Sequence, residues 1–307
     1  MVKKYNELDI AKGIAIIAVV LGHAFPDADY GISNLTANLI HALAYGFHMP
    51  VFFFIAGLLA AKHKEDAPAP YIKRRAAKLL IPYFVLSIIG LGLKLIFNSE
   101  ANHPTSLLQS WTILFGKSPM GGMWYLWSLF VMSLIFILLI RYIKQDWLIV
   151  LIGMIMHFLQ IYKTFFFMNN VMNFMVYFLL GVASKSFYDN IRDIDQRIIA
   201  CAAIPTYWLC INNYAPELVQ GMVGIVMILS ISMVIHSTLL ADIGRKSYTI
   251  YLLSYFIAIP IRVICYQRLA MNYWLVTALM FLGGFLIPYG IACLMSRKQE
   301  KHKMDLF

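Results

Sequence analysis

Long runs of hydrophobic residues, separated by short polar segments, cover most of the chain. Most runs approach the roughly 17–25 residues that a helix needs to cross the hydrocarbon core of a bilayer. The pattern predicts an all-α integral membrane protein with about ten transmembrane helices in a single multi-span domain over residues 1–307, without a separate soluble domain. The predicted spans are residues 9–25, 37–61, 79–97, 123–141, 147–162, 166–184, 198–212, 218–239, 247–265 and 272–295. Because the first, fifth and seventh spans are short, counts of nine and eleven stay open.

Composition supports the prediction of a membrane protein. Hydrophobic residues make up 61% of the chain and charged residues 13%, and the mean hydropathy is +0.73. A soluble globular domain has roughly 45–50% apolar residues. The four cysteines lie within apolar runs and form no metal-ligand pattern, so we expect inert packing residues and no metal site.

The formal net charge of +10 follows the membrane topology. The basic residues gather in alternate gaps between spans, as the positive-inside rule predicts, and this distribution argues against nucleic acid as a partner. Both termini are predicted to be cytoplasmic, with membrane lipids around the spans. Five of the 25 lysines and arginines then fall in the outer half: Lys94, Lys117, Lys163, Arg262 and Arg268.

The first span carries ionisable residues on one helical face. Lys12 and His23 are eleven residues apart, so they point within about 20° of each other, separated by roughly 16 Å along the axis. Asp9 lies on the same side. Ionisable residues inside a bilayer are costly and usually mark a pathway or a reactive site. An interfacial Asp9–Lys12 pair with a satisfied histidine is the simpler alternative. In the functional reading, neutral His23 is a general base that accepts a proton from a hydroxyl.

Three further segments carry candidate chemistry. Pro50 kinks the second span, where His48 shares a face with His41. Arg75 and Lys78 are neighbours on one helix face and suit a phosphate, such as that of coenzyme A. Trp124 and Tyr125 begin the fourth span, where they fit an acceptor-sugar site. Each segment also has a simpler explanation. The Pro50 segment can be a kinked helix with two polar contacts, the basic pair can be a positive-inside anchor, and the two aromatic residues can belong to an interfacial aromatic belt.

In this order, these motifs resemble the membrane-bound acyltransferase-3 family. The chain carries Asp-x-x-Lys-Gly from Asp9, the histidine eleven residues after Lys12, His-Met-Pro-Val-Phe-Phe-Phe-Ile-Ala-Gly from His48, and Arg-x-x-Lys before Pro-Tyr. Trp-Tyr-Leu and Gly-x-x-Ser-Tyr-x-Ile-Tyr-Leu-Leu follow, ending before Ser254. Lysine replaces arginine at positions 12 and 78, and Ser254 stands where many members have a second histidine, so Ser254 receives no catalytic role.

The resemblance implies transfer of an acyl group, most often acetyl, from cytoplasmic acyl-CoA to a hydroxyl of an envelope glycan or its lipid-linked precursor. It implies a multi-pass protein of the bacterial plasma (inner) membrane. By this resemblance His23 is the catalytic residue, and Lys12, Arg75 and Lys78 bind the acyl-CoA. Substrate contacts are assigned to Asp9, His48, Trp124 and Tyr125.

Two questions stay open from the residues alone. A group that orients His23 is expected on the outer side, where Asp27, Asp29, Glu100 and Glu217 are the acidic candidates. The alternative function is a multi-span transporter or flippase of a glycan or lipid precursor, whose expected signature is a pair of repeated halves with broken helices.

Overall fold

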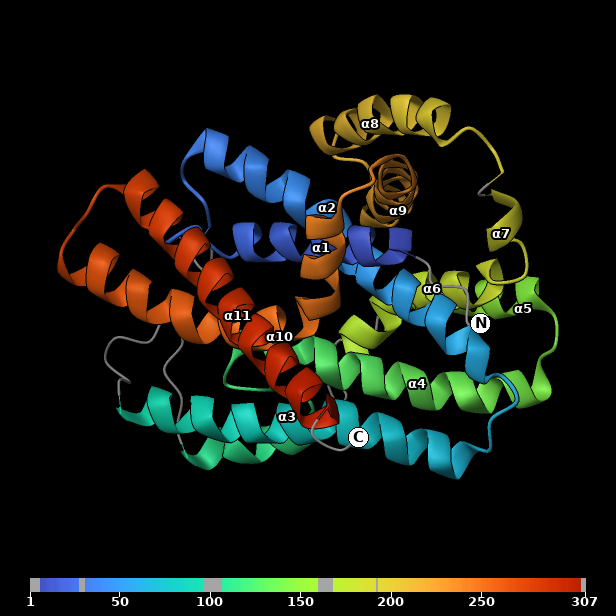
Figure 1. Cartoon of the computed structure of the whole chain (residues 1–307), viewed down its shortest axis with the longest axis horizontal. Helices are drawn as coiled ribbons and strands as arrows, with labels where there is room; N and C mark the ends of the chain where they lie inside the picture. Colours follow the sequence, from blue (N-terminus) through green and yellow to red (C-terminus); the bar gives the residue numbers. More distant parts are fainter. Residues whose placement is uncertain (1–5, 28–30, 97–106, 160–167, 192, 305–307) are drawn as a thin grey trace. The chain divides into compact units, whose positions relative to one another are not determined.

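The computed structural model describes residues 6–27, 31–96, 107–159, 168–191 and 193–304. Throughout these ranges the regular secondary structure is helical, which confirms the all-helical prediction (Figure 1). The chain forms two compact units. The first unit is Met1–Val51 with Asp195–Phe307, and the second unit is Phe52–Ile194.

The first unit is built around the most buried helix, α1. This helix packs against α10, α9 and α11, while α10 packs on α11 and α8 packs on α9. Buried side chains point in different directions around α1, among them Ile10, Ala15 and Ile16, as expected for a helix enclosed by several neighbours. The helices of this unit are α1 (Asn6–Gly22), the first part of α2 (Leu35–Ala60), α8 (Gln196–Asn212), α9 (Glu217–Val234), α10 (Thr238–Ile261), the π-helical η5 (Arg262–Arg268) and α11 (Tyr273–Met304).

In the second unit, the later part of α2 crosses α6 in backbone contact. A Cβ atom at Gly57 would lie 1.9 Å from the carbonyl oxygen of Phe178, and one at Gly181 would lie 2.0 Å from that of Phe54. Only glycine permits such an approach. The helices are the rest of α2, η1 (Ala61–His63), α3 (Pro68–Ile96), η3 (Leu107–Phe115), η4 (Gly121–Met123), α4 (Trp124–Tyr142), α5 (Asp146–Phe158), α6 (Met168–Ser184) and α7 (Tyr188–Ile191).

Each of the ten predicted spans overlaps a helix of the described chain, and parts of three spans, at residues 97, 160–162 and 166–167, lie outside the described residues. The helices differ in length. Helices α1, α6 and α8 have 17 residues each. Six helical segments of the described chain are long and apolar enough to cross a membrane: Leu35–His63, Pro68–Ile96, Gly121–Tyr142, Glu217–Val234, Thr238–Arg268 and Tyr273–Lys298.

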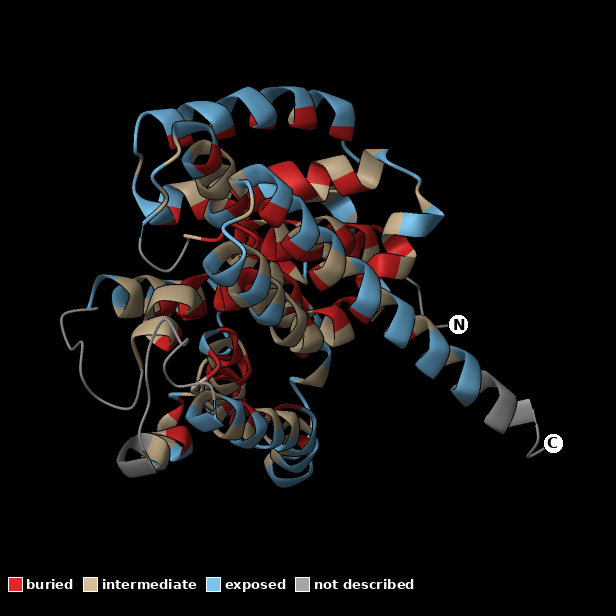
Figure 2. Cartoon of the chain, turned by 90° about the vertical axis from the view of Figure 1, so that its left-hand side faces the viewer, coloured by how far each residue is buried: buried red, intermediate tan, exposed pale blue. Residues whose placement is uncertain are grey.

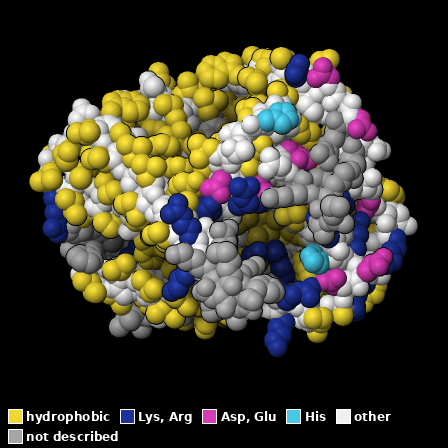
Figure 3. All heavy atoms as spheres, viewed as in Figure 1, with side chains coloured by type: hydrophobic (Ala, Val, Ile, Leu, Met, Phe, Trp, Pro, Cys, Tyr) yellow, Lys and Arg dark blue, Asp and Glu magenta, His cyan; other side chains and the backbone are white. Residues whose placement is uncertain are grey.

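The surface is strongly apolar, as a lipid environment requires. On α3, Ile81 is 60% exposed, Ile88 63% and Ile96 73%. Hydrophobic side chains cover much of the face shown in Figure 3, and exposed residues follow the C-terminal part of α11 in Figure 2. Exposed apolar surface of this extent marks a membrane protein.

Candidate functional site

Two glycines bring the first motif of the chain against its last motif. A Cβ atom at Gly13 would lie 2.2 Å from the carbonyl oxygen of Leu240, and one at Gly244 would lie 1.7 Å from that of Asp9. Helices α1 and α10 therefore cross with their backbones in contact, which small residues allow in membrane proteins. The crossing explains the glycines of the Asp-x-x-Lys-Gly and Gly-x-x-Ser-Tyr segments, and it aligns the two helices that reach His23.

His23 follows the last residue of α1 and is held by two tyrosines. Its Nδ1 atom lies 2.8 Å from the hydroxyl oxygen of Tyr45 on α2 and 3.0 Å from that of Tyr255 on α10. The Tyr45 hydroxyl also lies 3.2 Å from Nε2. Ring contacts reinforce the arrangement, with centroid distances of 5.4 Å to Tyr45 and 4.9 Å to Tyr255. The imidazole is therefore fixed from two helices and is partly accessible.

This geometry bears on which nitrogen can react. Both hydroxyls approach Nδ1, whereas Tyr45 alone approaches Nε2. In the tautomer that carries its proton on Nδ1, that N–H donates to a phenolic oxygen and the lone pair of Nε2 is available to accept a proton. In this tautomer Nε2 is the acceptor nitrogen of the neutral imidazole.

The face of α2 that meets His23 carries three aromatic or imidazole rings. His41 stacks on Tyr45 with a centroid distance of 3.9 Å, and His48 meets Tyr45 edge-on at 4.8 Å. His48 is 2% exposed, and its Nδ1–H donates to the carbonyl oxygen of Ala44 at 2.8 Å. The structure therefore joins His48 to the His23 cluster through the Tyr45 ring.

Lys12 and Asp9 form an ion pair on α1, with 2.7 Å between Nζ and Oδ1. Their side chains are 23% and 16% exposed, respectively. This ion pair is the one named in the simpler alternative for the first span, and it also keeps a cation near the α1–α10 crossing. His23 lies eleven residues further along the same helix direction.

Arg75 and Lys78 belong to the second unit. Arg75 Nε donates to the hydroxyl of Ser133 on α4 at 3.0 Å. Its Nη2 atom is buried and has no hydrogen-bond partner within the described part of the chain, and neither has the buried hydroxyl of Tyr71 one turn earlier. Lys78 is exposed. A guanidinium held at Nε with Nη2 unsatisfied is suited to an anion.

Trp124 and Tyr125 lie in an aromatic cluster of the second unit. Tyr125 packs against Phe53 at 5.0 Å between ring centroids, and Trp124 stacks on Phe174 at 5.5 Å. These contacts show a packing role for both residues. Their predicted contact with an acceptor sugar stays a prediction.

Sequence reasoning missed Tyr45 and Tyr255 because it looked for a carboxylate beside His23. Asp27 accepts hydrogen bonds from Tyr273 at 2.7 Å and from Ser33, and Glu217 begins α9. Asp29 and Glu100 lie outside the described residues. One signal was available, because Tyr45 lies between His41 and His48 on the face that these histidines share.

Among the described residues, no three or more histidine, cysteine, aspartate or glutamate side chains are grouped so that they could hold a metal ion.

Comparison with known proteins identifies the family. The model of the acyltransferase domain of the acyltransferase-3 family matches residues 5–293. Nodulation protein NolL of Sinorhizobium fredii is 32% identical over 123 residues, which cover 39% of this chain and 32% of that protein. The match thus spans about a third of the length of this curated relative. No solved structure matches the chain. The family match covers nearly the whole sequence, and the chain therefore belongs to the acyltransferase-3 family.

Proposed function

We propose that this protein transfers an acyl group from cytoplasmic acyl-CoA to a hydroxyl of an envelope glycan or its lipid-linked precursor, with acetyl as the expected acyl group. The observation that carries the proposal is His23, fixed by Tyr45 and Tyr255 at the end of a buried helix of an acyltransferase-family membrane protein. The proposed location is the bacterial inner membrane, with both termini cytoplasmic, which the distribution of basic residues supports.

In the proposed reaction, Nε2 of His23 accepts the proton of the acceptor hydroxyl as its oxygen attacks the thioester carbonyl. A carbon–oxygen bond forms, the carbon–sulfur bond breaks, and the proton on the imidazolium passes to the leaving thiolate. Tyr45 and Tyr255 hold Nδ1, so the ring keeps its orientation during both proton transfers. An acyl-histidine intermediate is the competing mechanism, and single-turnover mass spectrometry of His23 separates the two.

Donor binding is assigned to Lys12 in the first unit and to Arg75 and Lys78 in the second. The rise of roughly 16 Å from Lys12 to His23 is comparable to the reach of an extended pantetheine arm, so phosphates near Lys12 leave the thioester within reach of His23. The unsatisfied Nη2 atom of Arg75 supports a phosphate contact there.

The function is tested with membranes that contain the chain, radiolabelled acetyl-CoA and envelope glycans of the host. We expect label in the glycan fraction, released by mild alkali as an ester, and none in membranes without the protein. Movement of a glycan or lipid precursor across the membrane without label incorporation would instead establish a transporter.

Removing the two phenols together is expected to slow transfer while leaving donor binding intact. Without either hydroxyl, His23 loses its side-chain partners and samples unproductive orientations. A misplaced catalytic group costs about 10²-fold in rate, so the Tyr45→Phe/Tyr255→Phe double variant is expected to lose kcat by that factor with little change in the KM for acyl-CoA. Steady-state kinetics measure both. A Tyr207→Phe variant, which removes a hydroxyl bonded to Leu43 in the same unit, is the matched control. A double variant with the kcat of wild type refutes the orienting role.

Loss of Arg75 and Lys78 is expected to act on donor binding. Hydrogen bonds to charged groups contribute about 1.5–3 kcal/mol, so the Arg75→Ala/Lys78→Ala variant is expected to raise the KM for acyl-CoA about 10- to 100-fold. Lys73→Ala removes an exposed charge from the same helix and is expected to leave KM unchanged. A double variant with unaltered KM would return both residues to a role as topology anchors.

A further inference from the structure

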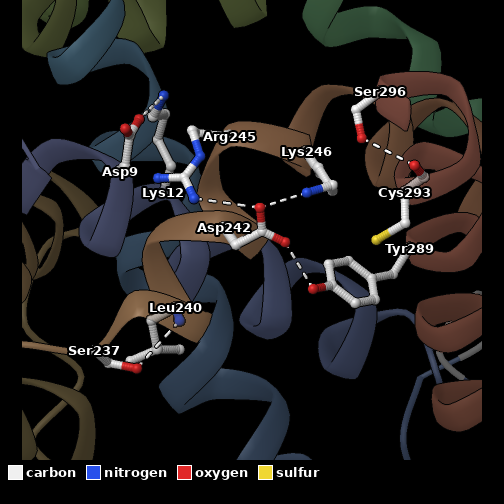
Figure 4. A network of polar contacts seen from close by, with 10 residues as sticks. All are labelled: Asp9, Lys12, Ser237, Leu240, Asp242, Arg245, Lys246, Tyr289, Cys293 and Ser296. Carbon is white, nitrogen blue, oxygen red and sulfur yellow. Dashed lines mark hydrogen bonds and ion pairs between the residues drawn. The ribbon is translucent and has the colours of Figure 1, made fainter. Parts of the chain in front are cut away.

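A charged cluster beside the α1–α10 crossing has no role in the reaction as proposed so far. Its centre is Asp242 on α10, whose carboxylate pairs with Arg245, through Nη2 at 3.2 Å, and with Lys246. The hydroxyl of Tyr289 on α11 donates to the other carboxylate oxygen at 2.7 Å. Figure 4 shows these four side chains together with Asp9 and Lys12.

The crossing fixes this cluster next to Lys12. A Cβ atom on Gly244 would meet both the Asp9 carbonyl oxygen, at 1.7 Å, and the Gly13 nitrogen, at 2.9 Å. Arg245 directly follows Gly244, and Lys12 directly precedes Gly13. The cations of the two helices therefore flank one backbone contact, at the opposite end of α1 from His23.

The two cations of α10 differ in what they can do. The side chain of Lys246 is 15% exposed, and its ammonium lies 5.7 Å from the centroid of the Tyr289 ring. Lys246 is therefore enclosed between Asp242 and the aromatic ring. The side chain of Arg245 is 41% exposed. Asp242 contacts its Nη2, and the guanidinium has further N–H groups that can donate to a ligand.

We propose that Arg245 and Lys12 together bind phosphate groups of the acyl-CoA nucleotide, with Asp242 as the positioning residue of Arg245. This inference rests on the proposed function and adds a donor-binding residue on α10. Lys12, Arg245 and Lys246 carry three positive charges, and Asp9 and Asp242 carry two negative charges, so the residues around the crossing have a net positive charge that attracts a polyanion. Exposed ion pairs are weak, whereas a guanidinium binds phosphate through two parallel charge-assisted hydrogen bonds.

The proposal is tested by equilibrium binding to the full chain in nanodiscs of phosphatidylcholine, with CoA and with phosphate-free pantetheine as probes. Arg245→Gln is expected to weaken CoA binding about 10-fold, the loss of one phosphate contact, without altering pantetheine binding. Arg245→Lys is expected to recover part of the loss, because lysine keeps the charge without the paired donors. Arg197→Gln, which removes an exposed arginine of α8 in the same unit, is the matched control and is expected to bind both probes normally.

If wild type and Arg245→Gln bind CoA with equal affinity, the inference is wrong. If Arg245→Gln loses the same factor in affinity for CoA and for pantetheine, Arg245 has a structural role and the inference is also wrong.

The phosphate of a lipid headgroup is the other ligand that this site could bind. If phosphatidylglycerol raises the thermal stability of wild type but not of Arg245→Gln, and CoA binding is unchanged, the site holds a lipid headgroup and the nucleotide assignment is wrong. CoA binding is measured without an acceptor, so the two proposals can fail separately. If wild type transfers acyl groups and Arg245→Gln binds CoA as wild type does, the role of Arg245 is wrong and the proposed reaction stands. CoA binding that depends on Arg245, with no transfer by wild type, refutes the proposed reaction alone.

Discussion

Replacement of His23 by alanine is expected to reduce acyl transfer by about 10²–10⁴-fold, the usual contribution of a general base. In the structure, hydroxyls of two tyrosines from different helices lie within hydrogen-bond distance of Nδ1, and in the proposed reaction Nε2 accepts the proton. Alanine removes the base and leaves Tyr45 and Tyr255 without their imidazole partner. Label incorporated from radiolabelled acetyl-CoA into the glycan fraction measures the loss.

Two further variants make this result specific. His23→Gln keeps a polar group that can bond to the tyrosines but has no basic nitrogen, so it is expected to be as inactive as His23→Ala. His236→Ala removes an exposed histidine whose Nδ1–H donates to the carbonyl oxygen of Val234, and it is expected to retain full activity. Near-normal transfer by His23→Ala in folded protein would contradict the catalytic assignment.

The sequence predicted the helices well, because hydropathy places helices regardless of their neighbours. The shared face of Lys12 and His23 stays a prediction, because α1 ends at Gly22 and His23 lies in the turn that follows. The membrane-spanning subset was harder to predict. Helix α5 has 13 residues and α1 has 17, so length alone separates them from the six long apolar helices.

The partners of His23 depend on packing between distant segments. Tyr45 lies 22 residues from His23 in sequence and Tyr255 lies 232 residues away, and single-sequence periodicity carries no information about which helices adjoin. A carboxylate is a common partner of a reactive histidine, so an acidic residue was expected beside His23. Asp27 is only four residues from His23 in sequence, but its two carboxylate oxygens accept hydrogen bonds from Tyr273 and Ser33. The Nδ1 atom of His23 instead lies next to the hydroxyls of Tyr45 and Tyr255.

A bulky residue at Gly244 is expected to destabilise the first unit strongly. The Cβ atom of any other residue would lie 1.7 Å from the Asp9 carbonyl oxygen and 2.9 Å from the Gly13 nitrogen, and both are backbone atoms of a buried helix. The clash can be relieved only if α1 and α10 move apart, which breaks the packing along their whole length. Overpacking of this kind costs about 1–3 kcal/mol or more, and a domain has only about 5–15 kcal/mol of net stability.

We therefore expect Gly244→Val to give little monodisperse protein in detergent, and Gly244→Ala to fold with a clearly lower melting temperature. Gly290→Ala on α11 is the matched control, because a Cβ atom there would meet no atom within 4 Å. Alanine has the better helix propensity, so this control is expected to be at least as stable as wild type. Equal melting temperatures for Gly244→Ala and Gly290→Ala would show that α1 and α10 separate at little cost. The contact between Gly13 and Gly244 would then not be what aligns His23 with Tyr255, or Lys12 with Arg245.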